Sequence, residues 1–590
     1  MKAIPYIPET APFTPEQRAW LNGFLAGLWA NGGPGEIAAL PPPPTAPAEP
    51  LLILYGSQTG TAEALSARLV KEARLRGFAP AVFPLNDYDK AGFSHAGKAV
   101  IISSTWGDGD PPDNAAGFWS WLNATSSPRL ESLRFGILGL GDRSYADFCG
   151  ASKKFDARLE ALGARRLLPR GECDVDYEAA AKEWIEALWR CLSTGVSLTN
   201  GRAERGVHDI GSAVPAAPAF GKTNPFPARL LRNVCLNKTG SSKDVWHHEI
   251  SLDGSGLAYE AGDALGVLPL NCPSLVNELL SSLRCSGDET VKLGDNETSL
   301  RDALTRQLEI VKPPPSLLEY VARRAPECEL APLLAPDRVA DLKQWVWGRD
   351  IIDIIRLLPE PAPAAEFVSL LRKLAPRLYS IASSPKAHPG EAHLCVGAVR
   401  YHSHGRKRHG VASVFLAERL ADAGTVRSFV QHSPSFRPPA DGDAPMIMVG
   451  PGTGVAPFRA FLEERQVAGA KGKNWLFFGD QKRATDFLYE EELARWVNER
   501  HLARLDLAFS RDQAEKVYVQ DRMVENALEL WSWLEEGAHF YVCGDASRMA
   551  SDVDAALHRV IETAGNRSPD DARAYVSKLR SERRYQRDVY

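Results

Sequence analysis

Short apolar runs alternate with amphipathic stretches in the first half of the chain. The apolar runs cover residues 51–55, 99–103 and 135–140, and each leads into a glycine-containing loop. Residues 63–76, which follow the first loop, have the spacing of an amphipathic helix. This alternation predicts a doubly wound parallel sheet that holds its ligand at the carboxyl ends of the strands.

The same alternation returns at the end of the chain. Predicted strands at 446–449, 475–478, 505–509 and 540–542 are separated by helical stretches, so a second doubly wound domain is expected over 444–590. The region 223–443 has a different pattern. Its strand-like segments, among them 227–236 and 245–251, predict an antiparallel β-barrel, and the helical pattern of about 272–373 predicts an insertion.

Residues 1–50 lie outside these patterns. Thr14, Pro15 and Gln17 form a helix start of the capping-box type, and an apolar face follows from Trp20 to Leu28. A tether rich in proline, glycine and alanine then leads to the first domain, and residues 196–222 form a second linker. The isolated helix is a candidate for self-association, and packing onto its own chain is the alternative.

Composition narrows the possible functions. A chain of 590 residues suggests about three or four domains, and a net charge of −5 argues against nucleic acid as a partner. No apolar run approaches the ~20 residues of a membrane span, so we expect a cytoplasmic protein. The nine cysteines are scattered without a CxxC pair, which predicts reduced thiols and no metal site.

The first loop, GSQTGTA at 56–62, lies between a predicted strand and a helix start. Backbone N–H groups, hydroxyls and the helix dipole converge there on an anion, and a flavin phosphate fits. The loop lacks the lysine of a P-loop, which disfavours a nucleoside triphosphate. Taken alone, the loop is also compatible with a structural turn.

Two further loops follow the next two predicted strands. Residues 104–109 contain Trp106, and residues 140–145 contain Tyr145. These aromatic rings can stack on the two faces of an isoalloxazine ring. Each ring taken singly could equally belong to the core, but three loops at successive strand ends together favour a flavin.

With these loops in place, residues 51–195 resemble the flavodoxin-like FMN domain of the diflavin reductases. Later motifs extend the resemblance over nearly the whole chain. It implies a multidomain α/β protein with a flavodoxin-like domain, an FAD-binding barrel with a helical insertion, and an NADP-binding domain. The implied FMN contacts are Ser57, Gln58, Thr59, Gly60, Thr61, Ala62, Ser104, Thr105, Trp106, Gly107, Leu140, Gly141, Asp142, Arg143, Ser144, Tyr145, Ala146, Asp147, Phe148 and Cys149.

The segment Arg377-Leu378-Tyr379-Ser380 is similar to the flavin motif RxYS of the family, and the segment 410–413 is similar to its second FAD loop. By this resemblance Arg377 pairs with the FAD pyrophosphate and Tyr379 packs on the flavin. The implied FAD contacts are Arg377, Leu378, Tyr379, Ser380, Cys395, Val396, Gly397, Tyr401, Gly410, Val411, Ala412, Ser413 and Tyr590. Three departures are Thr61, Trp106 and the segment 309–312, which lacks the usual Glu-Leu-Thr of the family.

In the last domain, a glycine-rich loop at 450–457 follows a predicted strand, which is weak evidence alone. Two further segments, 510–511 and 516–520, match the site of the family for the 2′-phosphate of NADPH. A guanidinium, an ammonium and hydroxyls suit a phosphate dianion, so NADPH is expected to be preferred over NADH. The implied NADP contacts are Gly452, Thr453, Ser510, Arg511, Lys516, Val517, Tyr518, Val519, Gln520 and Asp552.

The redox centre is also implied by the resemblance. A serine, a cysteine and an acidic residue surround the reacting atoms in this family, here Ser380, Cys543 and Asp588. Tyr590 would cover the FAD ring and move aside for nicotinamide. Taken singly, Cys543 is also compatible with a buried small residue and Tyr590 with a frayed end.

Within the family, the ending SKLRSERRYQRDVY resembles the flavoprotein subunits of assimilatory NADPH-sulfite reductases. This implies transfer of electrons from NADPH through FAD and FMN to a haemoprotein subunit with sirohaem and an iron–sulfur cluster. Two alternatives stay open: a soluble diflavin reductase for another haem or iron–sulfur acceptor, and a flavin-binding redox sensor without turnover.

Overall fold

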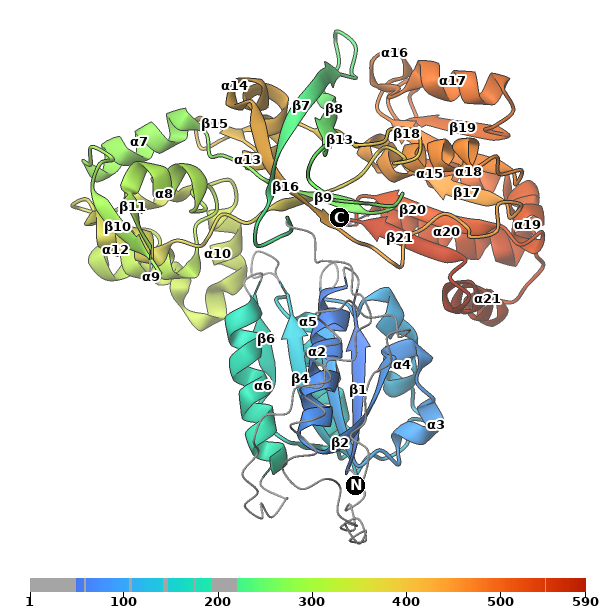
Figure 1. Cartoon of the computed structure of the whole chain (residues 1–590), viewed down its shortest axis with the longest axis horizontal. Helices are drawn as coiled ribbons and strands as arrows, with labels where there is room; N and C mark the ends of the chain where they lie inside the picture. The colour runs from blue at the N-terminus through green and yellow to red at the C-terminus, as the bar shows by residue number, and fades with distance from the viewer. Residues whose placement is uncertain are drawn as a thin grey trace, which may run out of the picture.

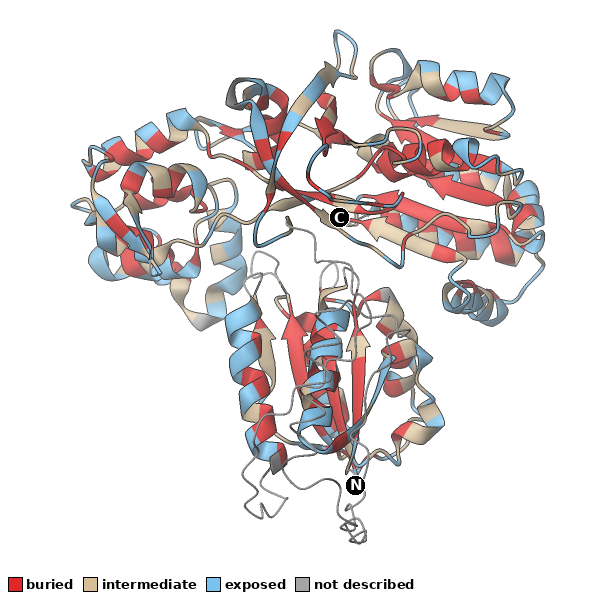
Figure 2. Cartoon of the chain, in the orientation of Figure 1, coloured by how far each residue is buried: buried red, intermediate tan, exposed pale blue. Residues whose placement is uncertain are grey.

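The computed structural model describes residues 49–57, 60–105, 109–141, 147–174, 177–193, 220–294, 296–546 and 548–590. The predicted N-terminal helix and nearly all of the linker at 196–222 lie outside these residues. Three large sheets organise the described part, and Figure 1 shows the first of them in a separate body below the other two. Strands fill the interior of each body while exposed residues gather on the outer helices (Figure 2).

The first sheet is parallel and has the order β2-β1-β3-β4-β5, with β6 paired to β4. Its strands are β1 (Glu49–Gly56), β2 (Phe78–Pro84), β3 (Lys98–Ser104), β4 (Arg134–Leu140), β5 (Arg165–Arg166) and β6 (Gly171–Cys173). The helical segments are α2 (Thr61–Leu75), η1 (Leu85–Asp87), α3 (Lys90–Phe93), α4 (Asp113–Asn123), α5 (Gly150–Ala161) and α6 (Tyr177–Ser193). The three predicted strands are confirmed. Sequence analysis missed β2 because most of its side chains are exposed or half-buried at the sheet edge.

The second sheet is antiparallel, with the order β12-β9-β16-β7-β8-β13. Its strands are β7 (Phe226–Cys235), β8 (Val245–Ser251), β9 (Ala264–Leu268), β12 (Arg377–Ser380), β13 (Glu391–Gly397) and β16 (Thr425–Gln431). A bridge between Ile381 and Leu394 links the two ends of this order, so the sheet closes as the predicted barrel. Three short helical segments complete it: α13 (Val411–Val414), η4 (Phe415–Arg419) and α14 (Leu420–Ala423).

A helical region with its own apolar core is inserted between β9 and β12 and lies beside the barrel (Figure 1). It confirms the helical pattern read over about 272–373. Its elements are α7 (Pro273–Leu283), β10 (Thr290–Leu293), β11 (Asn296–Ser299), α8 (Leu300–Arg306), α9 (Pro315–Arg324), η2 (Ala331–Leu334), η3 (Pro336–Arg338), α10 (Val339–Val346), α11 (Ile351–Ile355) and α12 (Ala364–Leu370).

A buried ion-pair network joins this insertion to the hairpin of β14 (Arg400–Ser403) and β15 (Arg406–His409). Arg406 Nη1 lies 2.7 Å from Asp350 Oδ1, and Arg408 pairs with both Asp350 and Asp353. Asp350 and Arg408 are 3% and 5% exposed. The hairpin leads directly into the predicted FAD loop at 410–413, so this network positions the loop against the insertion.

The third sheet is parallel, with the order β19-β18-β17-β20-β21. Its strands are β17 (Met446–Val449), β18 (Asn474–Asp480), β19 (Arg504–Phe509), β20 (His539–Gly544) and β21 (Tyr585–Val589). The helical segments are η5 (Gly452–Val455), α15 (Ala456–Val467), α16 (Arg483–Asp486), α17 (Glu490–Asn498), α18 (Val519–Glu525), α19 (Ala527–Glu535), α20 (Met549–Thr563) and α21 (Pro569–Ser581). Four strands are confirmed. Sequence analysis missed β21, whose polar sequence becomes a strand through pairing with β20.

Among the described residues, no helix combines the length and apolar character that a membrane crossing requires.

We predict that Asp350→Asn destabilises the barrel and its insertion. The amide can still cap α11, as Asp350 does by accepting from Asp353 N, but it leaves two arginines without their shared carboxylate. Removing one partner from a buried ion pair costs about 3–5 kcal/mol. The expected result is a lower midpoint in thermal or urea unfolding of the flavin-loaded chain.

The matched control is Asp341→Asn, which breaks an exposed pair with Arg338 and is expected to change stability by less than about 1 kcal/mol. An equal effect of both substitutions would contradict the role of the buried network.

Candidate functional site

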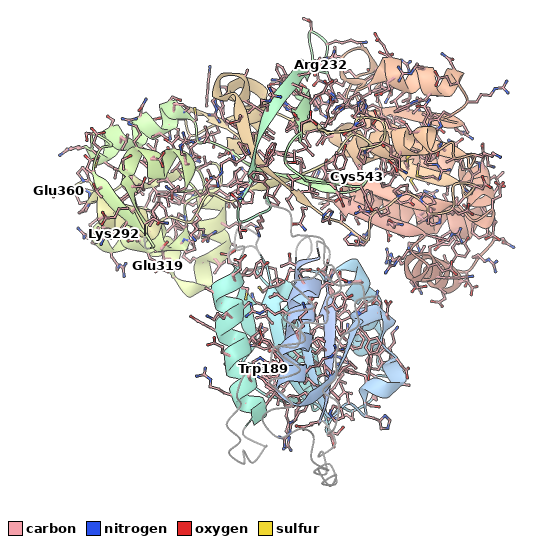
Figure 3. All side chains as sticks on the ribbon, viewed as in Figure 1. Trp189, Arg232, Lys292, Glu319, Glu360 and Cys543 are labelled. Atoms are coloured by element: carbon pink, nitrogen blue, oxygen red, sulfur yellow. The ribbon has the colours of Figure 1, made fainter. Side chains whose placement is uncertain are left out.

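The candidate redox centre lies where the barrel meets the third sheet. Ser380 ends β12 of the barrel, and its Oγ donates a hydrogen bond of 2.5 Å to Asp588 Oδ2 on β21. Cys543 on β20 is the register partner of Asp588, with Sγ 3.9 Å from the same carboxylate oxygen. Figure 3 labels Cys543 at this junction. The structure therefore brings together three residues that are far apart in sequence and that sequence analysis grouped.

The electrostatics of this centre are set by burial. Burial raises the pKa of Asp588, and the hydrogen bonds from Ser380 and Cys543 offset part of that effect. Burial also raises the pKa of Cys543 well above its usual range, helped by the neighbouring Asp588 carboxylate. The thiol is thus protonated at neutral pH, and it presents an S–H group instead of a reactive thiolate.

A cavity of about 730 Å³ opens beside this centre. Among its lining residues are the predicted NADP contacts Gly452, Thr453, Ser510, Tyr518, Val519, Gln520 and Asp552. Tyr590 also lines it, and its hydroxyl lies 2.9 Å from Thr453 Oγ1. Tyr590 as a whole residue is 60% exposed, while burial raises the pKa of its hydroxyl well above the usual range.

Close backbone packing explains one glycine of the loop above this cavity. A Cβ atom on Gly454 would lie 2.1 Å from the carbonyl oxygen of Cys543. A larger residue would therefore push the loop away from the strand end that carries Cys543. The glycine-rich loop fits a dinucleotide because its backbone can approach both the strand and the ligand.

The residues predicted to bind the 2′-phosphate of NADPH lie partly in the cavity and partly at its rim. Ser510 lines the cavity, whereas Arg511 and Lys516 are exposed on the adjoining loop and are not among the lining residues. Val517 packs against the core of the third domain. The positive charges therefore stand at the rim next to Ser510, which suits a phosphate at the end of a bound dinucleotide.

Several residues that line this cavity were not among the predicted contacts, and three of them are charged: Lys243, Asp480 and Arg548. Lys243 comes from the barrel and contacts Asp480 on β18, with Nζ 2.5 Å from Oδ1. Burial raises the pKa of Asp480, and Lys243 counteracts that shift. No local pattern marks Lys243, while the position of Arg548 shortly after Cys543-Gly544-Asp545 was an available signal.

Arg377 and the loop 410–413 of the predicted FAD set belong to the barrel. The Arg377 guanidinium on β12 lies 3.7 Å from Glu309 Oε2, so the segment 309–312 that departs from the family motif still lies at this site. Two hydrogen bonds hold the segment 410–413 against Val399. Val399 N donates to Ser413 Oγ at 3.2 Å, and Gly410 N donates to the Val399 carbonyl at 2.8 Å. Val411 and Ala412 begin the short helix α13, whose N-terminus suits a pyrophosphate.

The remaining predicted FAD contacts have different surroundings. Leu378 and Tyr401 are 45% and 47% exposed, so both can cover a bound ring. Tyr379 and Val396 face the barrel core. Cys395 is buried in the core between the barrel and the third domain, and Gly397 approaches Thr453.

The described FMN residues meet at the carboxyl edge of the first sheet. Ser57 N donates to Asn114 Oδ1 at 2.8 Å, and Ser57 Oγ accepts from Ala62 N at 3.3 Å. Gly60 has a φ of +81° and lies at the N-terminus of α2, which it does not cap with a side chain. This arrangement fits a phosphate.

The two neighbouring strand ends complete this edge. Thr105 N donates to the Leu140 carbonyl at 2.9 Å, and within the described residues Thr105 Oγ1 is a buried hydroxyl without a partner. Such an orphaned group fits a polar ligand atom. The other described contacts of the prediction are Ser104, Gly141, Asp147, Phe148 and Cys149; outside the described residues lie Gln58, Thr59, Trp106, Gly107, Asp142, Arg143, Ser144, Tyr145 and Ala146.

A second cavity, of about 180 Å³, separates this edge from the C-terminal segment. Ser57 and Gly60 line it from the first domain, and Arg583 and Arg587 line it from the third domain. The predicted phosphate edge of the first domain thus faces the segment that carries Asp588.

Comparison with protein families matches three parts of the chain. Residues 53–189 match a model described as flavodoxin, residues 218–415 match an FAD binding domain, and residues 448–555 match an oxidoreductase NAD-binding domain. The three matches follow the three large sheets in order.

Full-length relatives give a consistent result. The chain is 44% identical over 593 residues to the sulfite reductase NADPH flavoprotein alpha-component of Bacillus subtilis, covering 98% of this chain and 96% of the relative. It is 44% identical over 577 residues to the protein of the same name from Vibrio cholerae, with 98% and 93% covered. For the Vibrio vulnificus protein the identity is 41% over 597 residues, with 100% and 96% covered.

We predict that Ser380→Ala slows flavin reduction by NADPH and raises the pKa of Asp588 further. The substitution removes a hydrogen bond that favours the ionised carboxylate. A charge-assisted hydrogen bond is worth about 1.5–3 kcal/mol, or roughly ten- to a hundredfold in rate if it acts in the transition state. Stopped-flow absorbance over a pH series measures both effects.

Ser369→Ala is the control, since that hydroxyl is exposed on the insertion and bonds to the Glu366 carbonyl. An unchanged rate and pH profile for Ser380→Ala would show that the contact with Asp588 has no part in hydride transfer.

Proposed function

The chain belongs to the family of NADPH-sulfite reductase flavoprotein alpha-components, and from this premise we propose that it delivers electrons to a sulfite-reducing haemoprotein. It is an NADPH-dependent diflavin oxidoreductase with FMN, FAD and NADP-binding domains. The alpha-component name of its relatives describes one part of a larger enzyme. We propose that the acceptor is a separate haemoprotein that contains sirohaem and an iron–sulfur centre.

One observation supports electron transfer from NADPH to FAD. Ser380, Cys543 and Asp588 meet between the FAD-binding barrel and the cavity of the NAD-binding domain. When bound, FAD accepts a hydride from NADPH and FMN passes the electrons on singly. The chain contributes position and electrostatics. Ser380 holds the Asp588 carboxylate, which can balance positive charge on the nicotinamide side as hydride leaves, and the Cys543 thiol packs beside it.

Binding energy comes from groups away from the reacting atoms. We assign the 2′-phosphate to Ser510, Arg511 and Lys516 at the rim of the cavity, and the covering of the flavin ring to Tyr590. Tyr590 belongs to neither apolar core of the third domain, and its hydroxyl contacts Thr453, so the ring can move aside for nicotinamide by giving up that contact. On the other side, Arg377 and the loop 410–413 would hold the FAD pyrophosphate.

The acceptor must supply the sulfite-reducing metal centre. Reduction of sulfite to sulfide takes six electrons, and iron–sulfur clusters are held by grouped cysteine thiolates. In this chain the cysteines are free thiols at dispersed positions. The tests below distinguish this function from two alternatives. These are a reductase for another haem or iron–sulfur acceptor, and a flavin sensor without turnover. We further propose self-association through the N-terminal segment 1–50.

We predict that Arg511→Ala weakens NADPH binding roughly ten- to a hundredfold and leaves NADH binding nearly unchanged. The lost contact to the 2′-phosphate is charge-assisted and worth about 1.5–3 kcal/mol. Steady-state KM values for both nucleotides, with cytochrome c as acceptor, give the comparison. Arg573→Ala, an exposed arginine on α21, is the control; equal losses for NADPH and NADH would refute the assignment.

We predict that the purified chain reduces cytochrome c with NADPH but forms no sulfide from sulfite. Adding a sulfite-reducing haemoprotein should start sulfide formation, because the metal centre then receives electrons from FMN. Sulfide formation without the haemoprotein would overturn the proposal. Electron transfer to cytochrome c but not to the haemoprotein would indicate another acceptor, and no transfer to either would indicate a sensor.

A further inference from the structure

A cluster of histidines and glutamates lies on one face of the barrel strands β8 and β13 and does not include Ser380, Cys543 or Asp588. His247 and Glu249 are two residues apart on β8 and therefore share a face, and His393 on β13 is the cross-strand partner of Glu249. Each of the three side chains offers one ligand atom, and these atoms lie within 4.8 Å of one another. His247 Nε2 is 3.5 Å from Glu249 Oε1.

Both imidazoles are neutral at physiological pH. His247 and His393 are 7% and 2% exposed. Burial, followed by the nearby Arg459 guanidinium, lowers the pKa of His247 to about 2 and that of His393 to about 3. Neutral imidazole is the form that binds a metal ion, so protons do not compete for these nitrogens near pH 7.

One nitrogen of each ring is already held by a neighbour. His247 Nδ1 lies 2.9 Å from the hydroxyl of Tyr489, and His393 Nε2 lies 2.9 Å from Glu391 Oε2. Histidine ligands of metals are held in this way, with the second N–H donated to a carboxylate or another oxygen. In the described part of the chain, His393 Nδ1 is buried without a hydrogen-bond partner, an unusual state that calls for a ligand.

The two arginines near the cluster do not prevent a cation from binding there. Arg459 is paired with Glu463 and Glu492, at 2.8 Å and 2.7 Å, so its charge is compensated. Arg232 Nη1 lies 3.3 Å from Glu249 Oε1, but its side chain is 63% exposed on β7 and can turn into solvent (Figure 3).

We propose that His247, Glu249 and His393 form a zinc site, with one nitrogen of each imidazole and a Glu249 oxygen as ligands. Zinc binds nitrogen and oxygen at about 2.0–2.2 Å, which places tetrahedral ligands roughly 3.3–3.6 Å apart. The His247–Glu249 distance of 3.5 Å already meets this requirement. The earlier prediction of no metal site was based on the scattered cysteines. It does not apply to a site whose ligands are imidazoles and a carboxylate.

A neighbouring group supports the same location. His388, Glu391 and His393 form a second set of potential ligand atoms within 4.8 Å, and it shares His393 with the first. The rings of His388 and His393 have centroids 4.3 Å apart. His388 Nε2 already lies 3.1 Å from Glu463 Oε1, so water is the group that completes the coordination of the first set. The site would link β8 to β13 and, through Tyr489, the barrel to the start of α17 in the third domain.

The experiment uses the full, flavin-loaded chain without an affinity tag. After treatment with a chelator, the protein is equilibrated with zinc chloride, freed of excess metal, and measured by elemental mass spectrometry. We expect one zinc per chain in the protein and loss of zinc affinity by roughly tenfold or more in His393→Ala and in Glu249→Gln. Cobalt(II) should give tetrahedral ligand-field bands beyond the absorption of the oxidised flavins.

His402→Ala is the matched control, because His402 is an exposed histidine on β14 and should not affect zinc binding. Glu249→Gln, a nearly isosteric change at a half-buried position, keeps the test valid if His393→Ala fails to fold. The proposal is overturned if the unmodified chain retains no zinc. It is also overturned if Glu249→Gln retains as much zinc as the control His402→Ala. The outcome is independent of which acceptor receives the electrons.

Discussion

One hydrogen bond between two domains defines the reaction centre: Ser380 of the barrel donates to Asp588 of the third sheet at 2.5 Å. Such a contact requires two independently folded bodies to be held to a fraction of an ångström. The seam between them supplies this rigidity. Arg459 of α15 donates to the Ala382 carbonyl at 2.6 Å, and Ser384 N donates to Glu463 Oε2 at 2.8 Å. These bonds begin two residues beyond Ser380, so they fix the strand end that carries it.

The seam combines an apolar core with buried polar groups, and a buried polar group is costly unless it is paired. The chain reduces this cost with neutral histidines and with arginines shared between carboxylates. Depressed pKa values keep His247 and His393 uncharged, so that the buried charge near Arg459 is limited to ion pairs. The proposed zinc site uses this property, because the burial that keeps the imidazoles neutral also keeps them available as ligands.

Flavin and nucleotide loops are positioned by elements far from them in sequence. The hairpin β14–β15 is fixed through Arg406 and Arg408 to the insertion, and Lys243 of the barrel reaches Asp480 in the nucleotide cavity. The insertion and the barrel therefore position the loops that are predicted to bind FAD and NADPH. The first domain meets this assembly with its phosphate edge, across a small cavity lined from the other side by arginines.

The sequence alone determined the features that depend on local periodicity and loop chemistry. Residues 245–251 and 446–449 form strands as predicted, and the loop at 56–62 follows a buried strand and opens a helix. Resemblance to a family supplied Ser380, Cys543 and Asp588, although no local pattern joins them. Tertiary structure decided what depends on register and domain packing: the pairing of β21, the approach of Lys243 to Asp480, and the opposition of His393 and Glu249. These partners are separated by long stretches of chain, and hydrophobic periodicity describes which side of an element is buried but not which distant residue it will face.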